Sequence, residues 1–81
     1  MEVRIHYYAL LREIAGGSED TVTLADGSDG NDLLAAVAAR HPGMQKLLPV
    51  VRLASETEYL RRDDALKPGG TVQLIPPVSG G

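Results

Sequence analysis

The sequence contains no cysteine, which excludes disulfides, thiolate metal ligands and a thiol nucleophile from this chain. Phenylalanine and tryptophan are also missing, so a base-stacking surface for single-stranded nucleic acid is not expected. No apolar run approaches the roughly 20 residues that span a bilayer. The start, MEVRIHYY, has neither the basic nor the apolar part of a signal peptide. We therefore expect a cytoplasmic protein that does not act at a membrane.

A basic excess is missing as well. The formal net charge is −3 at pH 7, which argues against a nucleic-acid partner because phosphates are usually met by a basic patch. The one basic pair, Arg61-Arg62, is followed at once by Asp63-Asp64, and we expect a solvated turn there. With 81 residues, the chain has room for one domain with a small core.

Conventional catalytic groups are sparse. The two histidines, His6 and His41, fall on a strand face and at a helix end, with no evident acidic or metal-ligand neighbour. We expect both to be solvated or to serve as caps. The glycine pairs lack the pattern of a phosphate-binding loop. The sequence thus predicts no metal site and no bound cofactor.

Hydrophobic periodicity predicts the secondary structure. Residues 2–8 alternate between apolar and polar as in a strand, and residues 32–40 (DLLAAVAAR) carry a helical apolar stripe. Either Asp29 or Asn31 is suited to cap that helix. The sequence predicts strands over 2–8, 21–24, 50–54, 58–60 and 71–75 and helices over 9–15 and 32–40, with a short helical turn over 44–48.

This order of elements suits an α+β fold in which one main helix covers one sheet. We predict a β-grasp with a mixed sheet of four to five strands. The domain is expected to cover residues 1–75, and an extended tail residues 76–81. The expected core consists of Val3, Ile5, Leu24, Leu33, Leu34, Val37, Val51, Leu53, Leu60, Leu66, Val72 and Leu74.

The end of the chain is its most unusual feature. The last strand leads into Pro76-Pro77, which have no backbone donors and favour an extended conformation. Val78-Ser79 and then Gly80-Gly81 follow, and glycines can pass through a narrow channel because they have no side chains. Such a tail is suited to present the carboxylate of Gly81 to another protein's active site. A frayed tail without function is the alternative.

The ending LIPPVSGG resembles that of the small, sulfur-carrying subunits of molybdopterin synthase, which are ubiquitin-like β-grasp proteins. The resemblance also takes in ALLREIAG and EYLRRDDALKPGG, and so covers nearly the whole chain. It implies a sulfur carrier for molybdenum cofactor biosynthesis whose reactive residue is Gly81. It also implies that an adenylating enzyme of the ubiquitin-activating type uses ATP on Gly81, and that a sulfur-donor protein converts the adenylate into a thiocarboxylate.

The large subunit of the synthase is a further implied partner. It would receive the tail and supply the catalytic side chains, so this chain would donate sulfur without being a self-sufficient enzyme. Strand parity places Tyr8, Tyr59 and Ile75 on the sheet face opposite the helix. Together with Arg12, these residues form the expected partner-binding patch. The alternative is that they are ordinary half-buried residues of the sheet.

Three other functions stay open on the sequence alone. A sulfur carrier for thiamine or cysteine synthesis would share the terminal Gly80-Gly81, although the preceding Pro-Pro-Val-Ser favours the pterin pathway. A ubiquitin-like modifier would join Gly81 to lysine side chains of other proteins. A plain interaction domain would carry an idle tail.

Overall fold

Strands and helices follow one another in the predicted order in the computed structural model, which describes residues 1–77. The strands are β1 (Glu2–Tyr7), β2 (Glu19–Thr23), β3 (Arg52–Ala54), β4 (Tyr59–Leu60) and β5 (Thr71–Ile75). The helices are α1 (Leu10–Ala15) and α2 (Gly30–Arg40), and two 3-10 turns, η1 (Pro42–Met44) and η2 (Leu48–Val50), precede β3.

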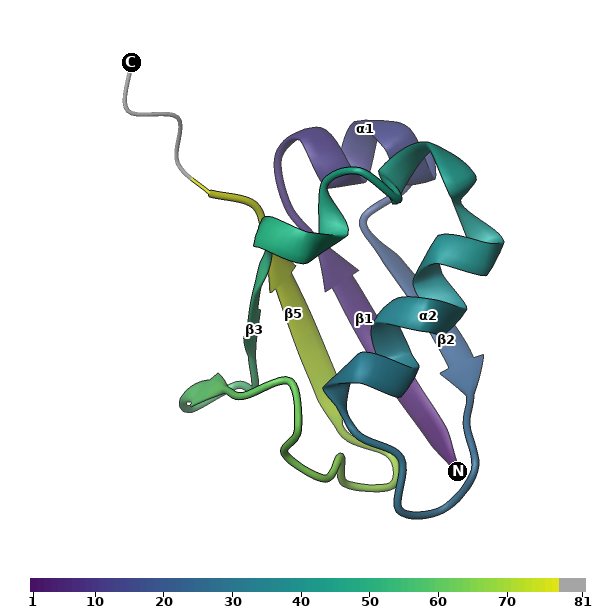
Figure 1. Cartoon of the computed structure of the whole chain (residues 1–81), viewed down its shortest axis with the longest axis vertical. Helices are drawn as coiled ribbons and strands as arrows, with labels where there is room; N and C mark the ends of the chain where they lie inside the picture. The colour runs from purple at the N-terminus through teal and green to yellow at the C-terminus, as the bar shows by residue number, and fades with distance from the viewer. Residues whose placement is uncertain (78–81) are drawn as a thin grey trace.

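The five strands form one mixed sheet in the order β2-β1-β5-β3-β4. β1 and β5 run parallel, and the other neighbouring pairs are antiparallel. α2 lies across one face of this sheet (Figure 1). The arrangement confirms the predicted α+β β-grasp. No helix within residues 1–77 has the length and apolarity needed to cross a bilayer.

The core lies between α2 and the sheet. Val3, Ile5 and Leu74 from the sheet and Leu33 and Val37 from α2 are at most 1% exposed. This alternation along β1 and β5 follows the strand period, because every second side chain points to the same face. The opposite face of the sheet therefore carries the remaining side chains, Tyr8 and Gln73 among them.

A capping box starts α2. The side chain of Asp29 accepts a hydrogen bond from the backbone N–H of Asp32, and the side chain of Asp32 accepts one from the backbone N–H of Asp29. Of the two predicted caps, Asp29 is therefore the one used. Gly30 follows directly, and a Cβ at this position would lie 2.6 Å from Leu53 Cδ1 and 3.0 Å from the carbonyl oxygen of Arg62. The helix can approach the sheet this closely only because residue 30 has no side chain.

The core differs from the prediction at its margins. Leu24 and Leu60 are only half-buried, although they pack against the core. Buried residues that the predicted core omitted include Tyr7, Leu11, Met44 and Leu48. Met44 and Leu48 lie in the irregular segment between α2 and β3, where no periodicity exists to reveal which side chains point inward.

The prediction of a solvated turn at Arg61-Arg62 is wrong for Arg62. Its guanidinium Nη2 donates to the carbonyl oxygens of Leu48, Pro49 and Val51 at 2.9, 3.0 and 2.9 Å. The carbonyl oxygen of Leu48 also accepts from the backbone N–H of Val51 at 3.3 Å, and the guanidinium gives the three carbonyl groups one shared donor. Arg62 thereby joins the segment after β4 to the segment before β3.

Candidate functional site

The strand register shows which strand ends lie beside the start of the predicted tail. β1 ends beside the end of β5, since Tyr7 pairs with Leu74, and β3 begins there, since Arg52 pairs with Ile75. We refer to this end of the sheet, marked by Tyr7, Arg52 and Ile75, as the tail-bearing end. β5 runs from it into Pro76-Pro77, of which the first is half-buried and the second exposed. The predicted residues Val78, Ser79, Gly80 and Gly81 lie outside the described residues.

Exposed apolar side chains gather at or near the tail-bearing end. Tyr8, just after β1, is 41% exposed, as strand parity predicts. Tyr59 in β4 is 61% exposed, but it pairs with Ala54, which pairs with Gln73, so its strand position is level with the middle of β5. Ile75, the last residue of β5, is half-buried. Leu10 at the start of α1 and Val50 just before β3 are 49% and 55% exposed, and neither belongs to the patch predicted from the sequence. The available signal for Leu10 was its position beside Leu11: adjacent helical residues point about 100° apart around the axis, so Leu10 is turned away from the direction in which Leu11 is buried.

A hydrogen-bond chain crosses the outer face of the sheet near this end. The Tyr8 hydroxyl donates to Oε1 of Gln73 at 2.7 Å, and Nε2 of Gln73 donates to the carbonyl oxygen of Ser55 at 3.1 Å. These two hydrogen bonds link the end of β1, the middle of β5 and the turn after β3. The three residues come from β1, β5 and β3, or from just beyond them. They meet because these strands are neighbours in the sheet.

The two remaining patch residues have different surroundings. The ring of Tyr59 lies under the guanidinium of Arg52, whose Cζ is 4.3 Å from the ring centroid. This cation–π contact turns the ring toward the strand position that pairs with Ile75. Arg12 is exposed on α1, and no ion pair of Arg12 is found within residues 1–77.

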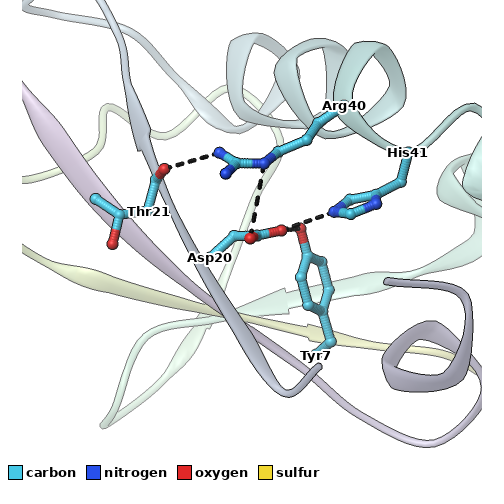
Figure 2. Close-up of polar contacts among 5 residues, drawn as sticks. All are labelled: Tyr7, Asp20, Thr21, Arg40 and His41. Atoms are coloured by element: carbon cyan, nitrogen blue, oxygen red, sulfur yellow. Dashed lines mark hydrogen bonds and ion pairs between the residues drawn. The ribbon is translucent and has the colours of Figure 1, made fainter. Parts of the chain in front are cut away.

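A polar cluster occupies the helix side of the same end (Figure 2). Oδ2 of Asp20 accepts a hydrogen bond from the Tyr7 hydroxyl at 2.7 Å and lies 2.7 Å from Nε2 of His41. Nη1 of Arg40 donates to the carbonyl oxygen of Thr21 at 3.1 Å, and its Nε lies 3.7 Å from Oδ1 of Asp20. The cluster therefore ties the end of α2 to β1 and β2.

The charges of the cluster support one another. Burial opposes the charge of Asp20, but the hydrogen bonds from His41 and Tyr7 and the charge of Arg40 outweigh it, so the pKa of Asp20 lies below its ordinary value. Burial, followed by the hydrogen bond to Asp20 and its negative charge, raises the pKa of the Tyr7 phenol well above its ordinary value. Because an ionised carboxylate can only accept, Nε2 of His41 carries the hydrogen in this contact.

The prediction that neither histidine has an acidic neighbour is wrong. His41 pairs with Asp20, which is 21 residues away in sequence, and Nε2 of His6 lies 3.2 Å from Oε2 of Glu19. The Tyr7 phenol nevertheless directs its proton toward the same carboxylate, so it is not set up as a nucleophile. No group of three or more potential metal ligands occurs within residues 1–77. The cluster is equipped to stabilise the fold.

One open groove of about 360 Å³ lies away from the tail-bearing end. Its walls include Glu56 and Glu58 from the turn after β3 and Gly69-Gly70 just before β5. Since β5 begins at Thr71 and ends at Ile75, the groove and the predicted tail lie at opposite ends of this strand.

Solved structures share this arrangement of sheet and helix. SAMP1 from Haloferax volcanii superposes with a TM-score of 0.88 at 24% identity, with all of both chains covered. A chain in the complex of subunits 1 and 2 of molybdopterin-converting factor from Helicobacter pylori gives 0.69 at 22% identity, again with full coverage of both. The ubiquitin of Caldiarchaeum subterraneum gives 0.65 at 23% identity, covering 100% of this chain and 98% of that one. The fold is a ubiquitin-like β-grasp.

Sequence relatives identify the family. The ThiS family matches residues 5–81. The molybdopterin synthase sulfur carrier subunit of Chlamydomonas reinhardtii is 42% identical over 83 residues, with all of both chains covered. The human protein of the same name is 30% identical, covering 99% of this chain and 94% of that one. This chain belongs to the ThiS family.

Proposed function

We propose that this chain is the sulfur carrier of a molybdopterin synthase, with the carboxylate of Gly81 as the group that bears the sulfur. The observation that carries the proposal is the family match, which runs through Gly81 and so includes the whole predicted tail. Both relatives named above are molybdopterin synthase sulfur carrier subunits. Their names favour molybdenum cofactor biosynthesis over thiamine or cysteine synthesis.

The proposed chemistry begins with activation, because a carboxylate is a poor electrophile. An adenylating enzyme would transfer AMP from ATP to Gly81 and release pyrophosphate, in the cytoplasm where ATP is available. The terminal sulfur of a donor persulfide would then attack the acyl carbon and displace AMP, which gives an acyl disulfide between Gly81 and the donor. A thiol would next attack the donor sulfur of that disulfide, form a new disulfide with the donor and release the thiocarboxylate on Gly81. Gly81 has no Cβ to shield that carbon, and because the chain has no cysteine, no internal thiol competes for the adenylate.

The tail-bearing end is the surface that we propose for the large subunit. Tyr8 exposes its ring there, and Tyr59 exposes a second ring on β4, which is separated from β5 by β3. Ile75 adds a half-buried apolar side chain, and Arg12 is available to an acidic residue of the partner. Tail residues Pro76 to Gly81 would enter the active site of the large subunit, which would supply the catalytic side chains.

Reconstitution of the synthase tests this proposal. We would combine the full chain with its activating enzyme, ATP, a sulfur donor, the large subunit and the pterin precursor, and measure molybdopterin. A variant that lacks Gly80 and Gly81 is expected to form no product. A variant extended by one alanine beyond Gly81 serves as the matched control, since it keeps both glycines but moves the carboxylate, and it is also expected to form none.

Two outcomes would contradict the sulfur-carrier function. Full activity of the shortened variant would show that the tail is idle. Isopeptide-linked conjugates to lysine side chains, formed in place of molybdopterin, would show that the chain is a protein modifier. Thermal unfolding of both variants should match that of the full chain, because the changes lie beyond β5.

A further inference from the structure

We infer that Gln73 is a positioning residue, which holds the Tyr8 ring in a fixed orientation at the tail-bearing end before the large subunit binds. The inference rests on the proposed function, because it concerns the surface that this partner would contact. It assigns a role to a residue in the middle of β5 that the expected partner-binding patch did not include.

Gln73 lies between two core residues, yet its side chain points away from the core. Val72 and Leu74 are 3% and 0% exposed on the helix side, so strand alternation places Gln73 on the outer face. There its amide lies between the Tyr8 hydroxyl, 2.7 Å from Oε1, and the Ser55 carbonyl oxygen, 3.1 Å from Nε2. The amide group therefore bridges two elements on either side of its own strand.

The bridge allows only one favourable orientation of the amide. The carbonyl oxygen of Ser55 can only accept, so it requires the NH2 group of Gln73. Oε1 is consequently directed toward Tyr8 and requires a donor, which the hydroxyl supplies. The backbone of Ser55 thus determines, through Gln73, where the hydroxyl of Tyr8 points.

A fixed Tyr8 ring lowers the cost of docking. Tyr8 is 41% exposed, so an unrestrained ring would lose rotamer freedom when a partner covers it. With the hydroxyl hydrogen directed to Gln73, the oxygen offers only a lone pair to an incoming protein. The group of the large subunit that meets this oxygen should therefore be a hydrogen-bond donor.

The other tyrosine of the patch is held by different chemistry. The Tyr59 ring lies under the Arg52 guanidinium, which is a cation and carries only donors. An acidic or carbonyl group of the partner fits beside Arg52, whereas a donor fits beside Tyr8. The two ends of the patch thus select for opposite polarity, which would orient the large subunit on the sheet.

A double-mutant cycle tests the positioning role. We would measure the Kd of the purified large subunit for the full chain and for Tyr8→Phe, Gln73→Met and the double variant. Each single change is expected to raise the Kd about 3- to 10-fold, the range for one hydrogen bond, and the double change no further. Thr71→Val, on the same strand and face but at the opposite end, should leave the Kd unchanged.

A purely structural role of Gln73 predicts a different pattern. Single effects that multiply in the double variant would overturn the inference, as would an unchanged Kd for either Gln73→Met or Tyr8→Phe. The extent of thiocarboxylate formation with the activating enzyme, measured as the mass of the intact chain, should be the same in all these variants. Loss of that mass change in the full chain would count against the proposed function, whereas the Kd values judge only the role of Gln73.

Discussion

Two neighbouring tyrosines each donate one hydrogen bond from the hydroxyl group, but the two bonds serve different roles. Tyr7 is 2% exposed and donates to Asp20 at 2.7 Å, whereas Tyr8 is 41% exposed and donates to Gln73 at 2.7 Å. The first lies on the helix side of the sheet and the second on its outer face. The two hydrogen bonds have the same length, so their different roles must come from the surroundings of the acceptors.

The acceptors explain the difference in energy. Asp20 is a charged group with a side chain only 18% exposed, so removal of a donor leaves a poorly solvated carboxylate. Gln73 is neutral and half-buried, and water can replace a lost partner at the exposed Tyr8 hydroxyl. We conclude that the inner face holds the fold together at the tail-bearing end, while the outer face presents an ordered surface.

Truncation of the two tyrosines should give the largest contrast. Tyr7→Ala removes a buried ring and the hydrogen bond to Asp20, and is expected to lower the free energy of unfolding by about 3–5 kcal/mol. Tyr8→Ala should lower it by less than about 1 kcal/mol. Chemical denaturation of both variants measures the two values. Equal losses would break the proposed division between the faces.

Charge at Ile75 should affect the outer face alone. Ile75→Asp is expected to weaken binding of the large subunit by about 30- to 100-fold, because it places a charge in the apolar patch. The domain should stay folded, since Ile75 lies outside the core. Thr71→Asp is the matched control, with the same new charge at the other end of β5. Loss of folding in Ile75→Asp would show that the face is assigned wrongly.

Acid should weaken the inner face through Asp20. Its pKa is lower in the folded chain than in the unfolded one, so its charge stabilises the fold above the ordinary carboxyl range. This stabilisation is lost as the pH falls below about 4 through the folded-state pKa. Asp20→Asn should therefore cost about 1–2 kcal/mol at pH 7 and progressively less in acid.

Denaturation at pH 7 and at about pH 3 checks this pH dependence. Asp63→Asn, which changes a carboxylate that is 68% exposed beside Arg61, is the control and should alter stability by less than about 0.5 kcal/mol. An Asp20→Asn cost that is the same at both pH values would mean that the charge of Asp20 does not stabilise the inner face.

The smallest expected effect concerns Ala9, where the chain leaves the sheet after Tyr8. Ala9 has a φ of 51° and a ψ of −127°, a backbone conformation that residues with a Cβ rarely adopt. Ala9→Gly should raise the free energy of unfolding by about 1 kcal/mol. Ala35→Gly, an exposed helical position, should lower it by a similar amount. Thermal unfolding distinguishes the signs, and a loss in both variants would contradict strain at Ala9.

Local patterns were enough to predict much of the tail-bearing end. The alternation of Val3, Ile5 and Tyr7 assigns Tyr8 to the outer face, and the apolar final strand followed by two prolines marks the start of the tail. These features depend on neighbours in sequence. The β-grasp order follows similarly from the succession of strands and one long helix.

Contacts between distant segments could not be read in the same way. Asp20 meets His41 only because β2 and the end of α2 pack together, and Gln73 reaches Ser55 only because β3 lies beside β5. Arg62 looked like a surface residue because its carbonyl partners come from an irregular turn. In each case the polar group finds its partner through tertiary packing, which periodicity does not record.

The mass of the intact chain tests the sulfur-carrier function most directly. The chain would be incubated with its activating enzyme, ATP and a sulfur donor, and then fragmented to locate any change. We expect a gain equal to the replacement of one oxygen by sulfur, localised to Gly81. An unchanged mass, with an activating enzyme shown to be active on a related carrier, would contradict the proposed function.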